Sequence, residues 1–141
     1  MGTKFSLKDP NPGVWFLFDE SDPNSGRICV RILNSAKGQE ITKATTKKRV
    51  EYKQGQRFEV FDIDEDKRSA MIWDYCIISW ERLEDDDGKP IECTPENKAK
   101  LMLENVGFAA FIGSCMAKLN AEFEARREAI EKNLLSTSRD N

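Results

Sequence analysis

Apolar residues change their spacing partway along the chain, and this change limits the fold more than any other feature. Before Asp64, apolar side chains tend to alternate with polar ones, which is typical of half-buried β-strands. After Asp64 they recur every three or four residues, which is typical of amphipathic helices. The sequence therefore predicts an α+β protein, in which a small antiparallel sheet packs on a helical C-terminal part.

Three segments have the pattern expected of strands. Residues 14–18 are aromatic and apolar, and residues 27–33 alternate, with Ile28, Val30 and Ile32 on one face. Residues 22–26 lie between them and have turn composition, so we expect a β-hairpin. Residues 57–62 alternate as well and are expected to form the third strand of the same sheet. Residues 34–54 are harder to assign and could include a helix, although a glycine and several threonines weaken it.

The second half of the chain predicts helices. One helix is expected over 64–83 and is followed by an acidic turn. Its apolar stripe comprises Ala70, Trp73, Cys76, Ile77, Trp80 and Leu83. Thr94 and Pro95 begin a short helix, because threonine caps free backbone N–H groups and proline suits the first helical position. The last helix is long, and its stripe comprises Phe108, Phe111, Ile112, Cys115, Leu119, Phe123 and Ile130.

The length of 141 residues suits a single domain over 1–141. Within it we expect a polar arm over 1–13, a mainly β part over 14–63 that could include a helix, a helical part over 64–135 and a frayed tail over 136–141. Trp73 and Trp80 are seven residues apart on one helical face, where core packing is favoured over a partner-binding surface.

Charge and residue usage exclude several functional classes. The net charge is -3, which opposes binding to phosphate backbones. A basic stretch over 43–57 nevertheless keeps open the alternative of a small nucleic-acid-associated regulator. The chain has no histidine, the commonest general base, so an enzyme would have to use carboxylates or a cysteine–lysine arrangement. We therefore expect no enzymatic activity.

No cofactor or metal is expected from the motifs. Asp62, Asp64 and Asp66 resemble the start of a calcium loop, but Lys67 and Trp73 occupy the positions that require glycine and a carboxylate. The aspartates are better explained as the end of a strand and the cap of a helix. The four cysteines form no closely spaced pair and fit buried, reduced thiols in a cytoplasmic protein. No apolar run approaches the ~20 residues that span a bilayer.

Several short stretches resemble a tail assembly chaperone family of long-tailed phages and prophages. The tryptophan-bearing segment 72–81, the D-G-x-P turn and T-x-E-N helix start of 87–98, and the C-terminal helix rich in Glu and Arg carry the resemblance. Residues 44–48 and 53–57 also fit. The similarity covers roughly residues 14–132.

The resemblance implies that the chain binds the tape measure protein and keeps it soluble in the host bacterial cytoplasm while the tail tube assembles. The tail tube protein is a second partner in that setting, and self-association stays open. No catalytic or cofactor residues come with the family. The partner-binding residues that we expect lie on the last helix: Phe108, Phe111, Ile112, Leu119, Phe123, Arg126 and Arg127.

Chelating agents should leave the stability of the protein unchanged, because the sequence offers no histidine and no close thiol pair as ligands. The measurement is the melting temperature with and without EDTA. A melting temperature that falls in EDTA would contradict the expectation.

Overall fold

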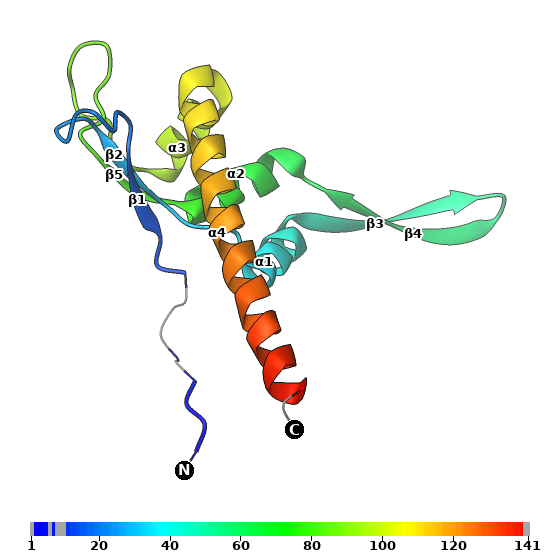
Figure 1. Cartoon of the computed structure of the whole chain (residues 1–141). Coiled ribbons are helices and arrows are strands. Elements are labelled where there is room, and N and C mark those ends of the chain that lie inside the picture. The colour runs from blue at the N-terminus through cyan, green and yellow to red at the C-terminus, as the bar shows by residue number, and fades with distance from the viewer. Residues whose placement is uncertain (1, 6, 8–10, 140–141) are drawn as a thin grey trace.

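The computed structural model describes residues 2–5, 7 and 11–139. In chain order its elements are β1 Val14–Leu17, β2 Arg27–Val30, α1 Ser35–Thr45, β3 Thr46–Lys53, β4 Gln56–Ile63, α2 Glu65–Cys76, β5 Ile77–Glu81, α3 Pro95–Glu104 and α4 Val106–Arg139. Small antiparallel sheets and a long C-terminal helix confirm the predicted α+β class (Figure 1). The ends of the chain are only partly covered: residues 1, 6 and 8–10 of the predicted arm, and 140–141 of the predicted tail, lie outside the described residues. Residues 136–139 of the predicted tail continue α4.

The predicted N-terminal hairpin is confirmed. Strands β1 and β2 pair antiparallel, with Phe16 opposite Ile28, and the backbone N–H of Phe18 donates to the carbonyl of Gly26 at 2.9 Å to close the connection. Alternation places Ile28 and Val30 on the inner face of the sheet, where both side chains are fully buried.

The third strand of this sheet is not the predicted one. The sheet has the order β1-β2-β5, and its third strand comes from 77–81, a segment that was predicted to continue a helix to residue 83. Residues 57–62 instead lie in β4, which pairs only with β3 in a separate two-stranded sheet among the described elements. The helix over 64–83 was therefore right only as far as Cys76, where α2 ends.

A register irregularity explains why 77–81 looks helical in the sequence. Val30 pairs with Ile77 and Ile28 with Trp80, so β5 has one more residue than β2 between the two pairs. Such a β-bulge turns two residues that are three apart toward the same side of the sheet. Ile77 and Trp80 are both buried as a result, and their spacing imitates the period of a helix.

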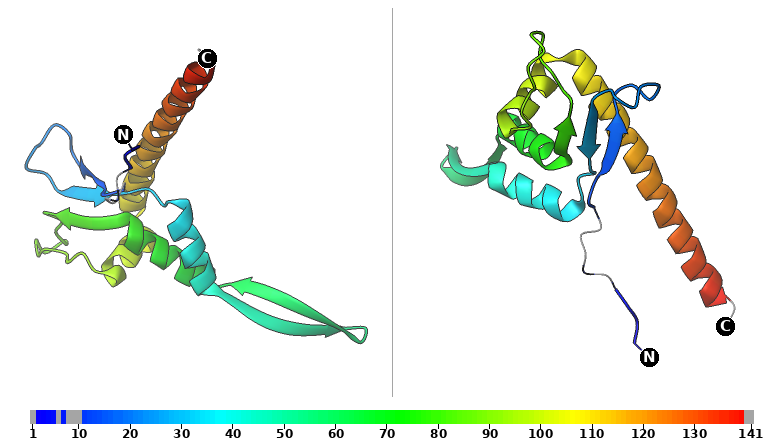
Figure 2. Two further views of the ribbon diagram at one scale, coloured as in Figure 1. Left: turned by 90° about the horizontal axis from the view of Figure 1, so that it is seen from below. Right: turned by 90° about the vertical axis from the view of Figure 1, so that its left-hand side faces the viewer.

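The first half of α4 covers the inner face of the sheet (Figure 2). Trp80 meets Phe108 edge to face, with ring centroids 6.0 Å apart and planes at 82°. The indole N–H of Trp80 also donates to the carbonyl of Ile91 at 2.7 Å. The buried core comprises Ile28, Val30, Ile77, Trp80, Phe108, Ile112, Cys115 and Leu119. Trp73 packs against this core from α2, so the two tryptophans do not share a helix as predicted.

Side-chain caps begin three of the helices where the sequence indicates them. Asn34, Asp64 and Thr94 each accept an N–H group from the residue three positions on, at 2.8, 3.2 and 3.2 Å respectively. Asp64 therefore has the capping role that was preferred over calcium binding. After β5, the side chain of Asp85 accepts the backbone N–H groups of Asp87 and Lys89 and holds the acidic turn.

The four cysteines are free thiols, as predicted. Cys29, Cys76 and Cys115 are buried, and Cys93 is half-buried. Burial raises the pKa of Cys76 to about 11, which disfavours the thiolate and makes this thiol a poor nucleophile at neutral pH.

Replacing Trp80 with alanine should lower the free energy of unfolding by about 3–5 kcal/mol, because the change empties a core site and removes the contact with Phe108. The measurement is chemical denaturation. Trp15→Ala is the control, because that side chain is 41% exposed and should lose clearly less. Equal losses for the two variants would contradict the assignment of Trp80 to the core.

Candidate protein-binding surfaces

Three of the residues predicted to bind a partner are core residues instead. Phe108, Ile112 and Leu119 are at most 8% exposed and pack against the sheet. Phe111 is half-buried and stacks on Phe18, with ring centroids 4.4 Å apart. These four side chains therefore stabilise the fold, and the prediction that they form a partner-binding face was wrong for the three buried ones.

The rest of the predicted site lies on the part of α4 beyond Leu119, which leaves the body of the protein (Figures 1 and 2). Every residue from 120 to 135 is exposed. Phe123, Ile130 and Leu134 are 50%, 60% and 64% exposed. Their spacings of seven and four place them on one side of the helix, which we call the α4 stripe.

Charged side chains accompany the α4 stripe. Arg127 follows Phe123 by four residues and forms ion pairs with Glu124 at 3.0 Å and Glu131 at 3.9 Å. Arg126 is exposed near the start of the stripe. Exposed pairs of this kind contribute little stability, but they keep the helix end soluble while its apolar side stays uncovered.

A groove joins the α4 stripe to the core. It lies where α4 leaves the sheet and is lined by Val14, Val30, Ile32, Leu119 and Phe123, together with polar neighbours. Because Leu119 is buried and Phe123 is half-exposed, the apolar surface continues from the inside of the protein onto the free helix.

A second projection consists of β3 and β4, which form a long ribbon pointing away from the body (Figure 1). Its turn is Gln54-Gly55, and both residues have positive φ, at 51° and 76°. This is the two-residue turn whose twist matches a β-hairpin, and it favours glycine at its second position. We call the residues 46–63 the ribbon.

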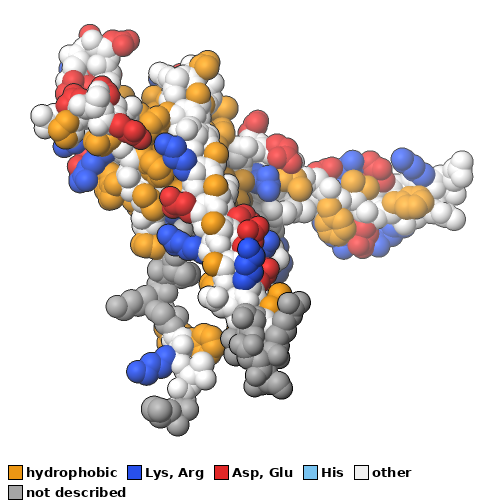
Figure 3. All heavy atoms as spheres, in the orientation of Figure 1, with side chains coloured by type: hydrophobic (Ala, Val, Ile, Leu, Met, Phe, Trp, Pro, Cys, Tyr) orange, Lys and Arg blue, Asp and Glu red, His pale blue; other side chains and the backbone are white. Residues whose placement is uncertain are grey.

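The ribbon exposes apolar side chains among charged ones (Figure 3). Pairing places Val50, Tyr52, Phe61 and Ile63 on one face, where they are 39%, 72%, 63% and 42% exposed. Phe58 is 44% exposed on the other face. The sequence reasoning missed this surface, although alternation on both sides of Gln54-Gly55 is a signal that could have revealed it.

The basic stretch over 43–57 becomes a surface of mixed charge. Three of its six cations have an acidic partner on the ribbon: the pairs are Lys48–Glu59, Arg49–Glu51, Arg49–Asp62 and Arg57–Glu59. For Arg49, the hydrogen bonds to both carboxylates raise the guanidinium pKa. The positive field that a nucleic acid needs is therefore weakened at this place.

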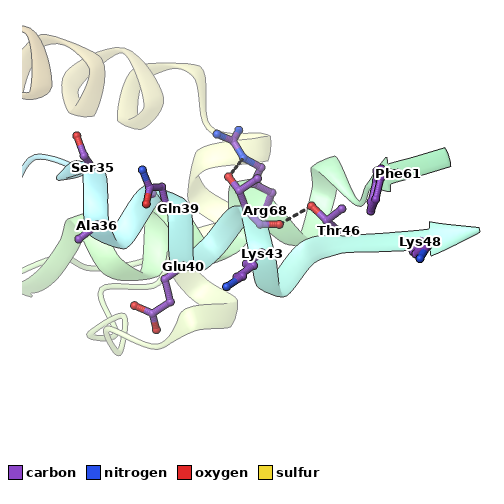
Figure 4. A pocket seen from close by; sticks show the side chains of 11 residues that line it. Ser35, Ala36, Gln39, Glu40, Lys43, Thr46, Lys48, Phe61 and Arg68 are labelled. Atoms are coloured by element: carbon purple, nitrogen blue, oxygen red, sulfur yellow. Dashed lines mark hydrogen bonds between the residues drawn. The ribbon is translucent and has the colours of Figure 1, made fainter. Parts of the chain in front are cut away.

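An open hollow lies between α1, the base of the ribbon and α2 (Figure 4). Arg68 reaches across it and donates to the hydroxyl of Thr42 at 3.4 Å. Ser35 and Glu40 point in opposite directions, so the polar side chains do not converge on one point as catalytic groups must. Its lining also includes Phe61 of the ribbon.

Within the part of the chain that the structure describes, no three side chains of Cys, Asp or Glu are grouped so that they could hold a metal ion. None of the described helices combines the length and the apolar character needed to cross a bilayer. Compared with protein-family models, with curated proteins and with solved structures, the chain gives no match. The interpretation of these surfaces therefore depends on their geometry.

Shortening the ribbon should leave the body of the protein stable, because its outer part points away from the body and its ion pairs with described residues stay within the ribbon. Lys48 and Phe61 already pair across the ribbon. Replacing residues 49–60 with Asn-Gly would connect them by a two-residue turn. The free energy of unfolding should change by less than about 1 kcal/mol, as for surface changes in general. A larger loss in chemical denaturation would mean that the outer ribbon supports the core.

Proposed function

We propose that this chain is a non-enzymatic tail assembly chaperone that binds the tape measure protein and keeps it soluble in the bacterial cytoplasm. One observation carries the proposal: nine of the fifteen exposed large apolar side chains among the described residues lie on two elements that project from the body, the free half of α4 and the ribbon. Apolar surface that a chain keeps uncovered is typical of protein-binding sites.

The α4 stripe is suited to bind a helical client. A free amphipathic helix can pack lengthwise against another helix through residues spaced at i, i+4 and i+7. Residues 120–135 provide roughly 24 Å of helix at 1.5 Å per residue. A tape measure protein is long, apolar and helical, so it offers a matching surface along its length.

The ribbon supports a second contact with a client. A lone two-stranded hairpin is marginally stable in water, and both of its outer edges have free backbone groups. Phe61 and Ile63 on one face would lose exposed apolar area when a client covers them. Binding would therefore stabilise the ribbon as well as the client.

Two other functions are less well supported. A nucleic-acid-associated regulator needs an unpaired basic surface, whereas Lys48, Arg49 and Arg57 have acidic partners and the net charge is -3. An enzyme that uses carboxylates needs convergent groups, and the side chains around the hollow on α1 diverge. Both interpretations predict activities that the chaperone does not need.

Co-expression with the tape measure protein tests the proposal. The full chain should keep that protein in the soluble fraction, and Phe123→Asp with Ile130→Asp should abolish the effect, because a charge on the α4 stripe opposes apolar contact. Ala125→Asp is the matched control, since Ala125 is exposed on the opposite side of the same helix. The soluble fraction of the tape measure protein is measured for each variant.

Truncation after Leu119 tests the assignment of the client to the α4 stripe separately from the chaperone function. The removed residues whose side chains are described, 120–135, are all exposed, so the body should stay folded. If the full chain never keeps the tape measure protein soluble, the proposed function is wrong. If the truncated chain protects equally well, the function stands and the assignment to the α4 stripe fails. Duplex DNA binding that is lost when Lys47, Lys48 and Arg49 become alanine would select the regulator.

A further inference from the structure

The outer end of the ribbon is apolar and positively charged. Tyr52 and Phe58 are 72% and 44% exposed, and Lys53 and Arg57 lie beside them. Residues 52–58 contain no acidic side chain, but Arg57 forms an ion pair with Glu59 just outside them, so the net positive charge of this end rests mainly on Lys53. We call these residues the ribbon tip.

A hollow with the opposite character lies between the β5–α3 connection and α3. Its apolar lining includes Leu83, Ile91 and Leu101, together with Phe18 and Phe108. A second hollow adjoins it along α3, and the two share Asp85, Ile91 and Lys100. Together they are lined by these charged residues: Arg82, Glu84, Asp85, Asp86, Glu92, Lys100 and Glu104. Five of these are acidic and two are basic, which gives a net charge of -3. Figure 3 shows the acidic side chains gathered on the connection at the upper left. We call this place the acidic hollow.

Further apolar side chains lie uncovered beside the acidic hollow. Leu103 and Val106 are 73% and 84% exposed at the junction of α3 and α4. They flank Glu104 and Asn105, which line the hollow. The acidic hollow and the ribbon tip thus both leave apolar area open to water, and their charges have opposite signs.

The ribbon tip cannot reach the acidic hollow of its own chain. Figure 1 and the left view of Figure 2 place the ribbon and the β5–α3 connection on opposite sides of the body. We infer that the ribbon tip of one copy docks in the acidic hollow of a second copy. The cations of the tip would face the acidic rim, and Tyr52 or Phe58 would cover the lining of Leu83, Ile91 and Leu101.

The symmetry of this contact determines what it builds. Two different surfaces meet, so each copy still has one free tip and one free hollow after it binds. Contacts of this kind produce rings or open chains rather than closed two-fold dimers. The contact uses neither Phe123 nor Ile130, so it can form whether or not the protein is a chaperone.

Complementary variants test the head-to-tail contact. The tip variant contains Lys53→Ser and Phe58→Ser, and the hollow variant contains Asp86→Lys and Glu104→Lys, so the two altered surfaces do not attract each other; all four side chains are exposed. Masses are measured by light scattering after gel filtration, over a range of protein concentration at low salt. The wild-type chain should exceed the mass of a dimer as concentration rises. Each variant alone should stay monomeric, and their equimolar mixture should form a dimer that grows no further.

Controls make each result decisive. Circular dichroism checks that every variant is folded, and Ala125→Asp on α4 should associate like the wild-type chain. The milder changes Lys53→Gln and Asp86→Asn should each weaken association about two- to fivefold, because an exposed charge pair contributes up to about 1 kcal/mol. A wild-type chain that is monomeric at every concentration would overturn the inference. So would a tip variant that associates alone, or a mixture of folded variants that forms no dimer.

Discussion

The packing of Trp80 against Phe108 joins the sheet, the β5–α3 connection and α4 at one point. The two rings meet edge to face, and the indole N–H of Trp80 holds the carbonyl of Ile91. Because this contact sets where α4 begins its path across the sheet, it also sets where α4 leaves it. The exposed half of the helix is thus a consequence of how its buried half is anchored.

A three-stranded sheet can cover only part of a helix as long as α4. Burial stops at Leu119 among the described side chains, while the apolar pattern continues to Phe123 and Ile130. The apolar side chains of the ribbon are uncovered for a similar reason. The backbone N–H of Asp64 donates to the carbonyl of Thr45 at its base, but among the described elements no sheet lies farther out to cover its faces. Both projections thus present apolar side chains that a partner can cover.

The two proposals use different surfaces of the molecule. The client is assigned mainly to the α4 stripe, whereas self-association is assigned to the ribbon tip and the acidic hollow. A head-to-tail array would therefore leave each α4 stripe free and would repeat it at a regular interval. Such repetition suits a long client, because linked sites raise the effective concentration of each further contact. The inner ribbon, with Phe61 and Ile63, could still contact a client in such an array.

Local chemistry in the sequence determined the α+β class, the first hairpin and the starts of three helices. Caps such as Asn34 and Thr94 act within three residues, so their effect can be read without the rest of the fold. The tertiary structure decided which strand joins the sheet and how much of α4 is buried. The bulge that turns Ile77 and Trp80 to one side depends on pairing with β2, which is distant in the sequence. The burial of Leu119 and the exposure of Phe123 depend on where the sheet ends. Periodicity identifies the apolar side of a helix, but only the packed neighbours determine what covers it.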